Sequence, residues 1–359
     1  MIENFLILDH DTPPPAVEHI IYCDGSGGRA FREDKDLDLS HWRPNRTLAR
    51  YRADTSTEIC FRFLDDPVQV RWTLAVNNHL DVDGMLAVYA LVHSGDALSH
   101  RSTIVQAAEM GDFWAWGEPP AQRLFQGLTR LMNRGTSESR SVQSIYEEAF
   151  RRIPAIIAQA DPDSAEIERS LDPLRDGVRL VEEHAIRRME LGTRFAHYVI
   201  PGTVVGQELD RAIYIPKFNE QISRKALLWP QARAKWDGER VCLVSVEAAR
   251  GWHHDVWFPG YLWAEISDRW AIPGMNYRDG MESYDLDMPA FNHAIQQLND
   301  AEQGARNWTT CAGAFMFNSL IQSQYPVVAR VLDKDGTAVA SRLDPAVVAK
   351  TLLPAFTFE

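Results

Sequence analysis

The first part of the chain alternates short apolar runs with polar loops. The runs at residues 5–8, 19–23 and 70–76 are each bounded by polar or turn-forming residues. Short runs of this kind are typical of buried strands. The run at 85–92 follows the third strand after a polar loop and predicts a helix packed on it, and residues 100–110 predict another short helix. Strands that alternate with helices predict an α/β fold with a parallel sheet in this part of the chain.

Another helix is expected to begin near residue 55. Thr55 or Ser56 has the side chain of a helix cap, and Glu58 follows in the first turn. Ile59 and Phe63 then recur at helical spacing and predict the buried stripe of that helix.

The pattern changes twice further along the chain. From residue 119 to about 191 the apolar positions recur at helical steps, and 164–191 predicts one long charged helix that connects two domains. Beyond it the sequence predicts strands at 195–200, 211–215, 241–246 and 255–258, helices at 289–302, 310–322 and 344–352, and a hairpin at 327–341. We therefore expect an α/β metal-site domain (1–118), a helical segment with its connector helix (119–194) and a smaller α+β C-terminal substrate domain (195–359).

Composition narrows the functional classes. The chain has 359 residues and a formal net charge of −13, which argues against a general nucleic-acid or membrane-surface binder. It has no signal-peptide pattern at its start and no apolar run long enough to span a membrane. The four cysteines are scattered and contain no CxxC pair, which predicts reduced thiols in the core. We expect a cytoplasmic protein, and a homodimer is the oligomer to consider.

The chemistry concentrates in the loop between the third strand and its helix. This loop carries Asn77, His79, Asp81 and Asp83 and ends at Gly84. In open α/β sheets, ligands bind at the carboxyl ends of strands. Two close carboxylates share a dry site only if a cation lies between them, and hard oxygen ligands with an imidazole suit Mn²⁺ or Mg²⁺, and less readily Zn²⁺. The alternative is a solvated turn in which Asp83 caps the next helix.

Other polar residues occupy comparable positions. Asp24 ends the second strand and begins a glycine-rich turn, His41 lies in a loop, and Asp112 follows the helix at 100–110. Such groups can converge on one edge of a sheet. A two-metal phosphohydrolase requires that arrangement, because its cations bind phosphate oxygens and activate a water near neutral pH.

Three segments resemble the DHH phosphoesterase superfamily. The strand followed by Asn77-x-x-x-Asp81-x-Asp83-Gly84 and an apolar helix is similar to its first motif, above all in the RecJ-like branch, with His79 in the place of the first aspartate. His41-Trp42-Arg43-Pro44-Asn45, with residues 53–59, is similar to its Asp-His-His-x-x-Asn segment and the Ser-Ser-Thr-x-Glu helix start. Residues 20–24 are similar to the strand and lone aspartate that precede it.

The resemblance covers roughly residues 18–112. It implies Mn²⁺-dependent hydrolysis of a phosphoester or phosphoanhydride, and a parallel α/β domain followed by a smaller domain that grips the substrate. The chain departs from the family in motif order, which implies a circular permutation, and in the triplet, which reads Ser40-His41-Trp42. It also lacks a Gly-Gly-Gly-His segment. The start of the HAD phosphatases is a rival match for residues 81–86, but Met85 stands in place of their threonine.

The candidate site residues have three expected roles. The predicted metal ligands are Asp24, Asn77, His79, Asp81, Asp83 and Asp112, and the predicted catalytic residues are Asp81, Asp83, His79 and His41. The predicted substrate-binding residues are Asn45, Arg46, Asn78, His253 and His254. Solvated loop arginines and a strand-edge histidine pair are the alternatives for Arg46 and for His253 with His254.

Three functions remain open. The first is a metal-dependent hydrolase of a small anionic substrate, with no nucleic-acid or membrane partner. The second is a metalloenzyme on the same scaffold that acts on a non-phosphate bond, which the incomplete triplet at residues 40–42 favours. The third is a non-catalytic binding protein, which the aromatic-rich stretch at 229–270 favours.

Overall fold

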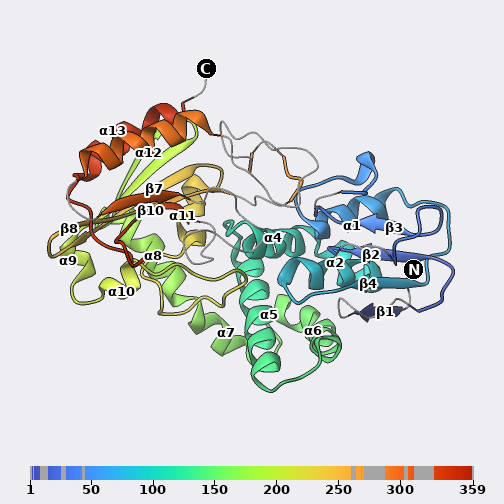
Figure 1. Ribbon diagram of the computed structural model, residues 1–359. Coiled ribbons are helices and arrows are strands. Elements are labelled where there is room, and N and C mark those ends of the chain that lie inside the picture. The colour runs from blue at the N-terminus through green and yellow to red at the C-terminus, as the bar shows by residue number, and fades with distance from the viewer. Residues whose placement is uncertain are drawn as a thin grey trace. The chain divides into compact units, whose positions relative to one another are not determined.

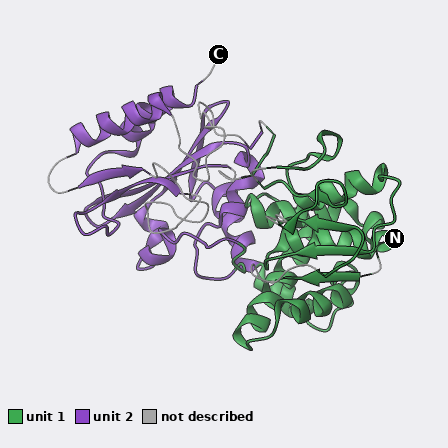
Figure 2. Ribbon diagram, turned by 45° about the vertical axis from the view of Figure 1, so that its right-hand side comes forward, with its two compact units in different colours: residues 1–171, 219–222, 263–267 green, residues 172–218, 223–262, 268–359 purple. Residues whose placement is uncertain are grey.

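A computed structural model describes residues 2, 4–8, 15–25, 30–42, 45–259, 264–267, 269–270, 288–302, 306–310 and 327–357. The chain forms two compact units (Figure 2). Unit 1 contains Met1–Leu171, Asn219–Ile222 and Trp263–Ser267, and unit 2 contains Asp172–Phe218, Ser223–Leu262 and Asp268–Glu359.

Unit 1 is built on a four-stranded parallel sheet in the order β1-β4-β2-β3 (Figure 1). The strands are β1 (Asn4–Ile7), β2 (Ile20–Cys23), β3 (Leu37–Leu39) and β4 (Leu74–Asn77). Ile21 of the central β2 pairs with Ala75 on one side and with Leu37 on the other. The expected α/β fold with a parallel sheet is confirmed. Because β2 and β4 are parallel neighbours, their carboxyl ends lie at the same edge of the sheet.

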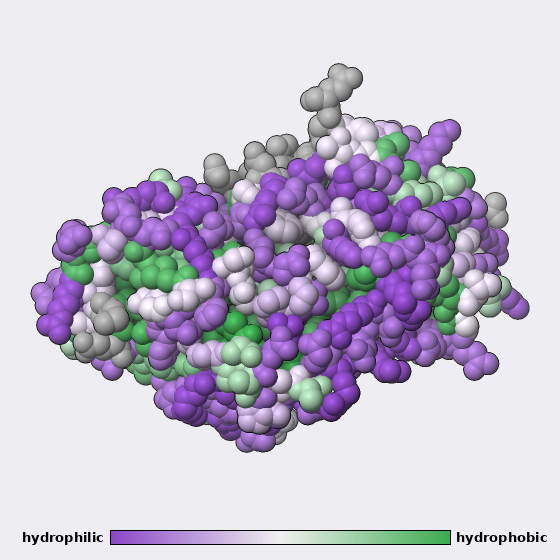
Figure 3. All heavy atoms as spheres, turned by 180° about the vertical axis from the view of Figure 1, so that it is seen from behind, coloured by the Kyte–Doolittle hydropathy of each residue, from purple (hydrophilic) through white to green (hydrophobic). Residues whose placement is uncertain are grey.

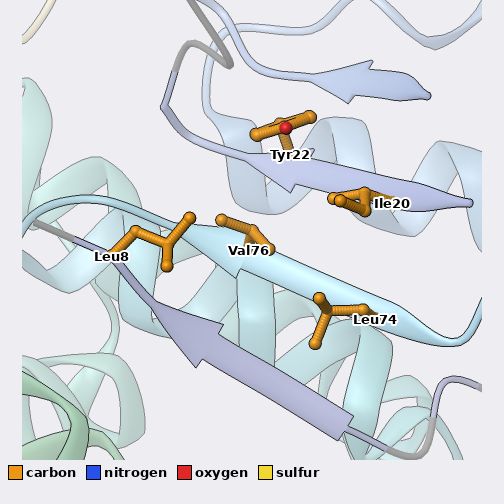
Figure 4. Close-up of a cluster of buried hydrophobic side chains, with 5 residues drawn as sticks. All are labelled: Leu8, Ile20, Tyr22, Leu74 and Val76. Atoms are coloured by element: carbon orange, nitrogen blue, oxygen red, sulfur yellow. The ribbon is translucent and has the colours of Figure 1, made fainter. Parts of the chain in front are cut away.

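The two faces of this sheet are packed differently. Ile20 and Tyr22 of β2 lie beside Leu74 and Val76 of β4, and with Leu8 they form a buried cluster on one face (Figure 4). On the other face, helices α1 (Ser56–Asp65) and α2 (Val82–Val92) pack against each other and against the strands. The alternation of side chains along each strand thus supplies one apolar surface to each face.

The remaining helices of unit 1 extend the helical layer. They are α3 (Ser94–Ser99), α4 (Arg101–Asp112), α5 (Pro119–Ser137), α6 (Val142–Ile157) and α7 (Ser164–Ser170), with a 3-10 turn at Ala49–Tyr51. Helix α4 packs on α2 and α5, and α6 packs on α5 and β1. The helices of residues 119–171 therefore belong to the same unit as the sheet, and the separate helical segment predicted for 119–194 is wrong.

The predicted long connector helix at 164–191 is also wrong. Residue Asp172 opens unit 2 with α8 (Asp172–Glu182), and the backbone then turns at His184, whose φ is +60°. The next residues form strand β5 (Arg187–Gly192), which pairs antiparallel with β6 (Phe195–Ile200). Strand pairing has overridden the helical charge pattern on which the prediction was based.

Unit 2 contains a six-stranded sheet in the order β5-β6-β7-β8-β10-β9. The further strands are β7 (Val241–Ala248), β8 (Gly251–Trp257), β9 (Asn307–Thr310) and β10 (Val327–Leu332). Only β6 and β7 are parallel, and the other neighbours are antiparallel. The helices are α9 (Gly202–Val205), α10 (Leu209–Ala212), α11 (Pro230–Asp237), α12 (Pro289–Ala301) and α13 (Pro345–Leu352), with a 3-10 turn at Leu353–Ala355.

Helices pack on both faces of this second sheet. Tyr198 points toward α11, where its hydroxyl donates to Asp237 at 2.5 Å. Phe195 points to the opposite face and contacts Phe356, just beyond α13, with ring centroids 5.2 Å apart. Figure 1 shows α12 and α13 side by side on that face. The two units are nearly equal in length, so the second is not the smaller domain that was predicted.

The remaining predictions concern single helices and strands. Thr55 caps α1 by accepting from the Glu58 N–H at 3.1 Å, as expected. The strand predicted at 211–215 is wrong, because residues 209–212 form helix α10. Strand β3 was not predicted. The helix predicted at 310–322 lies outside the described residues apart from Thr310, which ends β9.

The face shown in Figure 3 is mostly hydrophilic and the described cysteines are buried, as the composition predicts. Figure 3 shows a face on which hydrophilic residues predominate, with smaller hydrophobic areas among them. None of the described helices combines the length and apolar character that a membrane span requires. Cys23, Cys60 and Cys242 are buried free thiols, as predicted, and Cys311 lies outside the described residues.

Candidate metal centre

Asp24 lies directly after β2, with its carboxylate fully buried. Its backbone adopts a left-handed conformation, with φ +53°, which aspartate tolerates better than most residues. Its Oδ1 atom accepts hydrogen bonds from Ser56 Oγ at 2.7 Å and Trp42 Nε1 at 3.0 Å. Its Oδ2 atom lies 2.9 Å from His79 Nε2. Three side chains from three different segments of the chain thus fix the orientation of this one carboxylate.

His41 presents one ring nitrogen to the carboxylates. Its Nδ1 atom donates to the Asp54 carbonyl oxygen at 2.5 Å, because a carbonyl can only accept. The Nε2 atom lies 3.4 Å from Asp24 Oδ1, 3.9 Å from Asp83 Oδ2 and 3.7 Å from Asp112 Oδ2. The Asp54 carbonyl therefore fixes the ring so that Nε2 faces acidic side chains.

His79 repeats this arrangement from the other side of Asp24. Its Nδ1 atom lies 2.8 Å from Asn78 Oδ1, an acceptor, and its Nε2 atom lies 3.2 Å from Asp81 Oδ2 in addition to Asp24. Histidines that ligate metals characteristically donate their other ring N–H to a carbonyl or carboxylate oxygen. Both histidines have the hydrogen-bonding pattern of metal ligands.

Asp81 and Asp83 are placed by the start of α2. Asp81 caps this helix, since its Oδ1 accepts from the Gly84 N–H at 2.8 Å. Asp83 does not cap α2, which was the alternative expected for it. Its two oxygens accept from the Ser56 and Thr57 N–H groups at 2.7 and 2.8 Å, at the N-terminus of α1. The N-terminus of α1, which carries a partial positive charge, thus holds the Asp83 carboxylate of α2.

Gly84 allows these groups to approach one another. A Cβ atom at this position would lie 2.2 Å from Asn77 Nδ2 and 2.8 Å from both Asp24 Oδ2 and Asp81 Oδ1. No ordinary side chain fits there without displacing a carboxylate. The glycine that follows the Asp-x-Asp pair is therefore required by the packing of the site.

Asn77 ends β4 and is held by hydrogen bonds on both sides of its amide. Its Nδ2 atom donates to the Tyr146 hydroxyl at 2.9 Å, and its Oδ1 accepts from the Asn78 N–H at 2.7 Å. The Tyr146 hydroxyl in turn donates to the His79 carbonyl at 3.0 Å. Helix α6 therefore supports the loop through one tyrosine, and direct ligation by Asn77 stays a prediction.

Two groups of side chains have the spacing needed to hold a metal ion. They are Asp24 with His79 and Asp81, and Asp24 with His41 and Asp83, and within each group the ligand atoms all lie within 4.8 Å of one another. Asp24 belongs to both. Asp112 lies beside the second group, through its contact with His41, but is not part of it. Each group offers three protein ligands, which is the number typical of metal sites that keep a position for water or substrate.

The electrostatics favour a cation. Burial opposes ionisation of Asp24, but pairing with His79 outweighs it and lowers the pKa of Asp24. Burial, and then the charge of Asp24, raise the pKa of Asp83 to about 7. Burial opposes protonation of His79, yet Asp81 and Asp24 raise its pKa well above the ordinary value. In the described part of the chain, the ion-pair partners of these three carboxylates are His79 and His41 and no lysine or arginine. A divalent cation would neutralise this excess of negative charge.

The comparisons with known proteins give one result. A family model described as a family of unknown function, DUF6687, matches residues 11–204. The chain belongs to this family. No curated protein and no solved structure matches the chain. The DUF6687 match contains every residue of both metal-binding groups, together with the supporting Tyr146.

Three predicted substrate-binding residues lie in the DUF6687 region but belong to neither metal-binding group: Asn45, Arg46 and Asn78. Asn45 Oδ1 accepts from the Thr47 N–H at 2.7 Å, which makes a local turn. Arg46 lies 3.4 Å from Glu33 and stacks over Phe31, 5.1 Å from the ring centroid. Asn78 does reach the site, where it orients His79. Substrate binding by these three residues stays a prediction.

His253 and His254 lie on β8 in unit 2, beyond the DUF6687 match. His254 is buried, lies 3.2 Å from the Leu343 carbonyl through Nε2 and contacts Ser245 Oγ through Nδ1 at 2.8 Å. His253 points to the opposite face of the strand. These contacts account for His254 within the core of unit 2, and substrate binding by the pair stays a prediction.

Sequence reasoning missed four residues that shape the site. Ser56 and Trp42 donate to Asp24, the Asp54 carbonyl fixes His41, and Tyr146 supports Asn77 and the His79 carbonyl. Ser56 and Trp42 lie in the two segments, 53–59 and 41–45, that resemble DHH motifs. Tyr146 falls in an ordinary amphipathic helix, and nothing in its spacing distinguishes it from a core residue.

Proposed function

We propose that the protein is a metal-dependent hydrolase that cleaves a phosphoester or phosphoanhydride in a small anionic substrate, with Mn²⁺ as the preferred metal. The observation that carries this proposal is the mirrored pair of histidines on either side of Asp24. Each directs Nε2 toward Asp24 and gives Nδ1 to an oxygen acceptor. Two sites that share one carboxylate are the arrangement used by two-metal hydrolases.

The donor set fits the proposed metal. Carboxylate oxygens with one imidazole per group suit Mn²⁺ or Mg²⁺ better than a soft metal, and no cysteine belongs to either group. When bound, a divalent metal lowers the pKa of water and binds phosphate oxygens. The chain's own residues set the geometry: Asp24 bridges the groups, while Asp81 and His79 serve one and Asp83 and His41 the other.

The phosphate assignment rests on the resemblance to the DHH phosphoesterases. That family orders its motifs differently along the chain, but Asp24 and Asn77 end adjacent parallel strands, so their order in the sequence does not affect where they meet. Asp112 at the end of α4 reaches the His41 side of the cluster, where the family's last aspartate would be expected. A circularly permuted relative would have this arrangement.

A second candidate is a metalloenzyme that acts on a non-phosphate bond. Trp42 stands where the family has a histidine, and its indole donates to Asp24 and lies edge-on against His79, with ring centroids 5.5 Å apart. This tryptophan replaces a ligand with an apolar wall, which favours a smaller or less charged substrate.

Metal analysis combined with turnover tests the proposal. The full chain would be purified with Mn²⁺, its metal content measured, and bis(p-nitrophenyl) phosphate and pyrophosphate offered as substrates. We expect bound metal and Mn²⁺-dependent turnover, both lost in His79→Gln and retained in the control His293→Gln, which alters an exposed histidine of α12. Bound metal without turnover of any phosphoester would favour the second candidate. Absence of bound metal would overturn both and leave a non-catalytic binding protein.

A further inference from the structure

Arg233 lies in α11 of unit 2 and is almost entirely buried, with 4% of its surface exposed. Within the described residues its guanidinium makes one hydrogen bond, from Nη1 to the Leu228 carbonyl at 3.3 Å, and no ion pair. Buried arginines are normally paired with an acidic group, because an isolated buried charge is costly. Apart from that contact, the guanidinium has N–H donors with no hydrogen-bond partner among the described residues, although the side chain as a whole is nearly buried.

The nearest buried carboxylates are already paired with other arginines. Asp237 accepts from Arg188 at 2.6 and 2.7 Å and from Arg240 at 2.8 Å. Asp255 accepts from both Nε and Nη2 of Arg330, at 2.9 and 3.1 Å. Among the described residues, Arg233 thus has no carboxylate partner, in a chain whose net charge is −13.

The side chain that contacts Arg233 carries a second unused donor. The guanidinium stacks over Trp257, with its Cζ atom 4.2 Å from the ring centroid. The Nε1–H of Trp257 is buried and has no hydrogen-bond partner among the described residues. Most buried polar groups in proteins have a partner, so this indole N–H, next to an arginine that pairs with no carboxylate among the described residues, requires an explanation.

We propose that Arg233 and Trp257 form an anion-binding site in unit 2 that accepts a carboxylate or phosphate group of a small molecule. A planar guanidinium binds two oxygens of such a group at once, and stacking on an aromatic face leaves its edge available for this contact. The site shares no residue with the metal centre, which lies in unit 1. It would bind an anion whether or not the protein is a hydrolase.

The competing explanation is that Arg233 only packs on Trp257 and satisfies the Leu228 carbonyl. The two explanations predict different thermal midpoints for the ligand-free Arg233→Gln variant. Loss of a packing residue would lower the thermal midpoint. Loss of an unpaired buried charge would leave the midpoint unchanged or raise it.

The test is calorimetric titration of the full chain with inorganic phosphate, pyrophosphate and citrate in the presence of EDTA, which removes any contribution of metal. We expect wild type to bind at least one of these probes and Arg233→Gln to bind it about 10- to 100-fold more weakly, the loss typical of a charged hydrogen bond. Arg233→Lys should be intermediate. The control Arg134→Gln, which alters an exposed arginine paired with Glu148, should bind like wild type.

The titration also separates this site from the proposed hydrolase. Asp83→Asn, which alters the metal centre, should retain the EDTA-resistant binding. The proposal is overturned if none of the three probes binds wild type, or if Arg233→Gln binds as tightly as wild type. It is equally overturned if the substitution lowers the midpoint of the ligand-free protein while Arg233→Lys restores it without restoring binding.

Discussion

Asp24 Oδ2 lies 2.9 Å from His79 Nε2, and the two residues follow neighbouring parallel strands, β2 and β4. The other oxygen of Asp24 faces His41 at 3.4 Å. One buried carboxylate therefore joins the two halves of the candidate metal centre. We therefore expect that substitutions of Asp24, or of the residues that hold it in place, weaken metal binding more than they lower the stability of the fold.

Asp24→Asn should abolish metal binding in both groups at once. The amide keeps the size of the side chain but loses the charge, so we expect metal affinity to fall by more than about 100-fold. Without metal the variant should unfold somewhat more easily than wild type, because the lowered pKa of Asp24 means that its ionised form is stabilised in the folded protein. Metal content by mass spectrometry and thermal unfolding with EDTA measure the two effects. Asp65→Asn, at an exposed residue paired with Arg101, is the control.

Gly84→Ala should damage the site by steric conflict. Its Cβ would lie 2.2 Å from Asn77 Nδ2, so Asn77 or a carboxylate must move. Overpacking of this kind typically costs about 1–3 kcal/mol. We expect a lower free energy of unfolding in urea together with weaker Mn²⁺ binding.

Gly95→Ala is the matched control for that substitution. Gly95 lies in helix α3, and an added Cβ meets no atom within 4 Å. Alanine is favoured over glycine by about 0.5–1 kcal/mol in a helix interior and by less in the first turn, where Gly95 lies. This variant should therefore be as stable as wild type or slightly more stable, with unchanged metal binding. Equal behaviour of the two alanine variants would contradict the packing argument.

Tyr146→Phe should separate support of the loop from ligation. The variant leaves the His79 carbonyl and the Asn77 amide without their partner at 3.0 and 2.9 Å. Unpaired buried groups cost about 1–3 kcal/mol, and we expect a comparable loss in the free energy of unfolding. Metal affinity should fall by about 10- to 100-fold. Unchanged affinity in isothermal titration with Mn²⁺ would show that α6 does not position His79.

Unit 2 should lose stability in mild acid through a separate pair of histidines. His197 Nε2 contacts Ser245 Oγ at 2.9 Å, and Ser245 Oγ contacts His254 Nδ1 at 2.8 Å. Because His254 Nε2 donates to the Leu343 carbonyl, the neutral ring accepts from Ser245 Oγ–H through Nδ1. Ser245 thus lies between the two rings, and its one hydroxyl proton serves only one of them.

Burial lowers the pKa of His197 to about 4 and that of His254 to about 3. In the unfolded chain both would protonate near pH 6.5. The unfolded state thus binds more protons below that pH, and stability falls as the pH drops from about 6.5 toward 4, by an amount on the order of a few kcal/mol. His254→Gln should show a weaker fall in the free energy of unfolding between pH 7 and pH 5. His293→Gln, at an exposed position, should follow wild type, and parallel curves for all three proteins would refute this assignment.

The part of the site that the sequence could predict is the part fixed by chain topology. Asp24 and Asn77 each end an apolar run, and parallel strands bring such ends to one edge, so their meeting with His79 and Asp81 follows from the pattern. Tyr146 could not be predicted, since its role depends on how α6 packs against the sheet rather than on its own spacing. The same limit explains the error at residues 187–192, where pairing with β6 decides the conformation.

The central claim is that two metal ions share Asp24. A crystal structure of the full chain grown with Mn²⁺ and recorded at an energy where manganese scatters anomalously would test it directly. The account predicts two anomalous peaks, one bonded to Asp24, His79 and Asp81 and the other to Asp24, His41 and Asp83. Crystals that contain Mn²⁺ elsewhere but show no peak against the Asp24 carboxylate would contradict it.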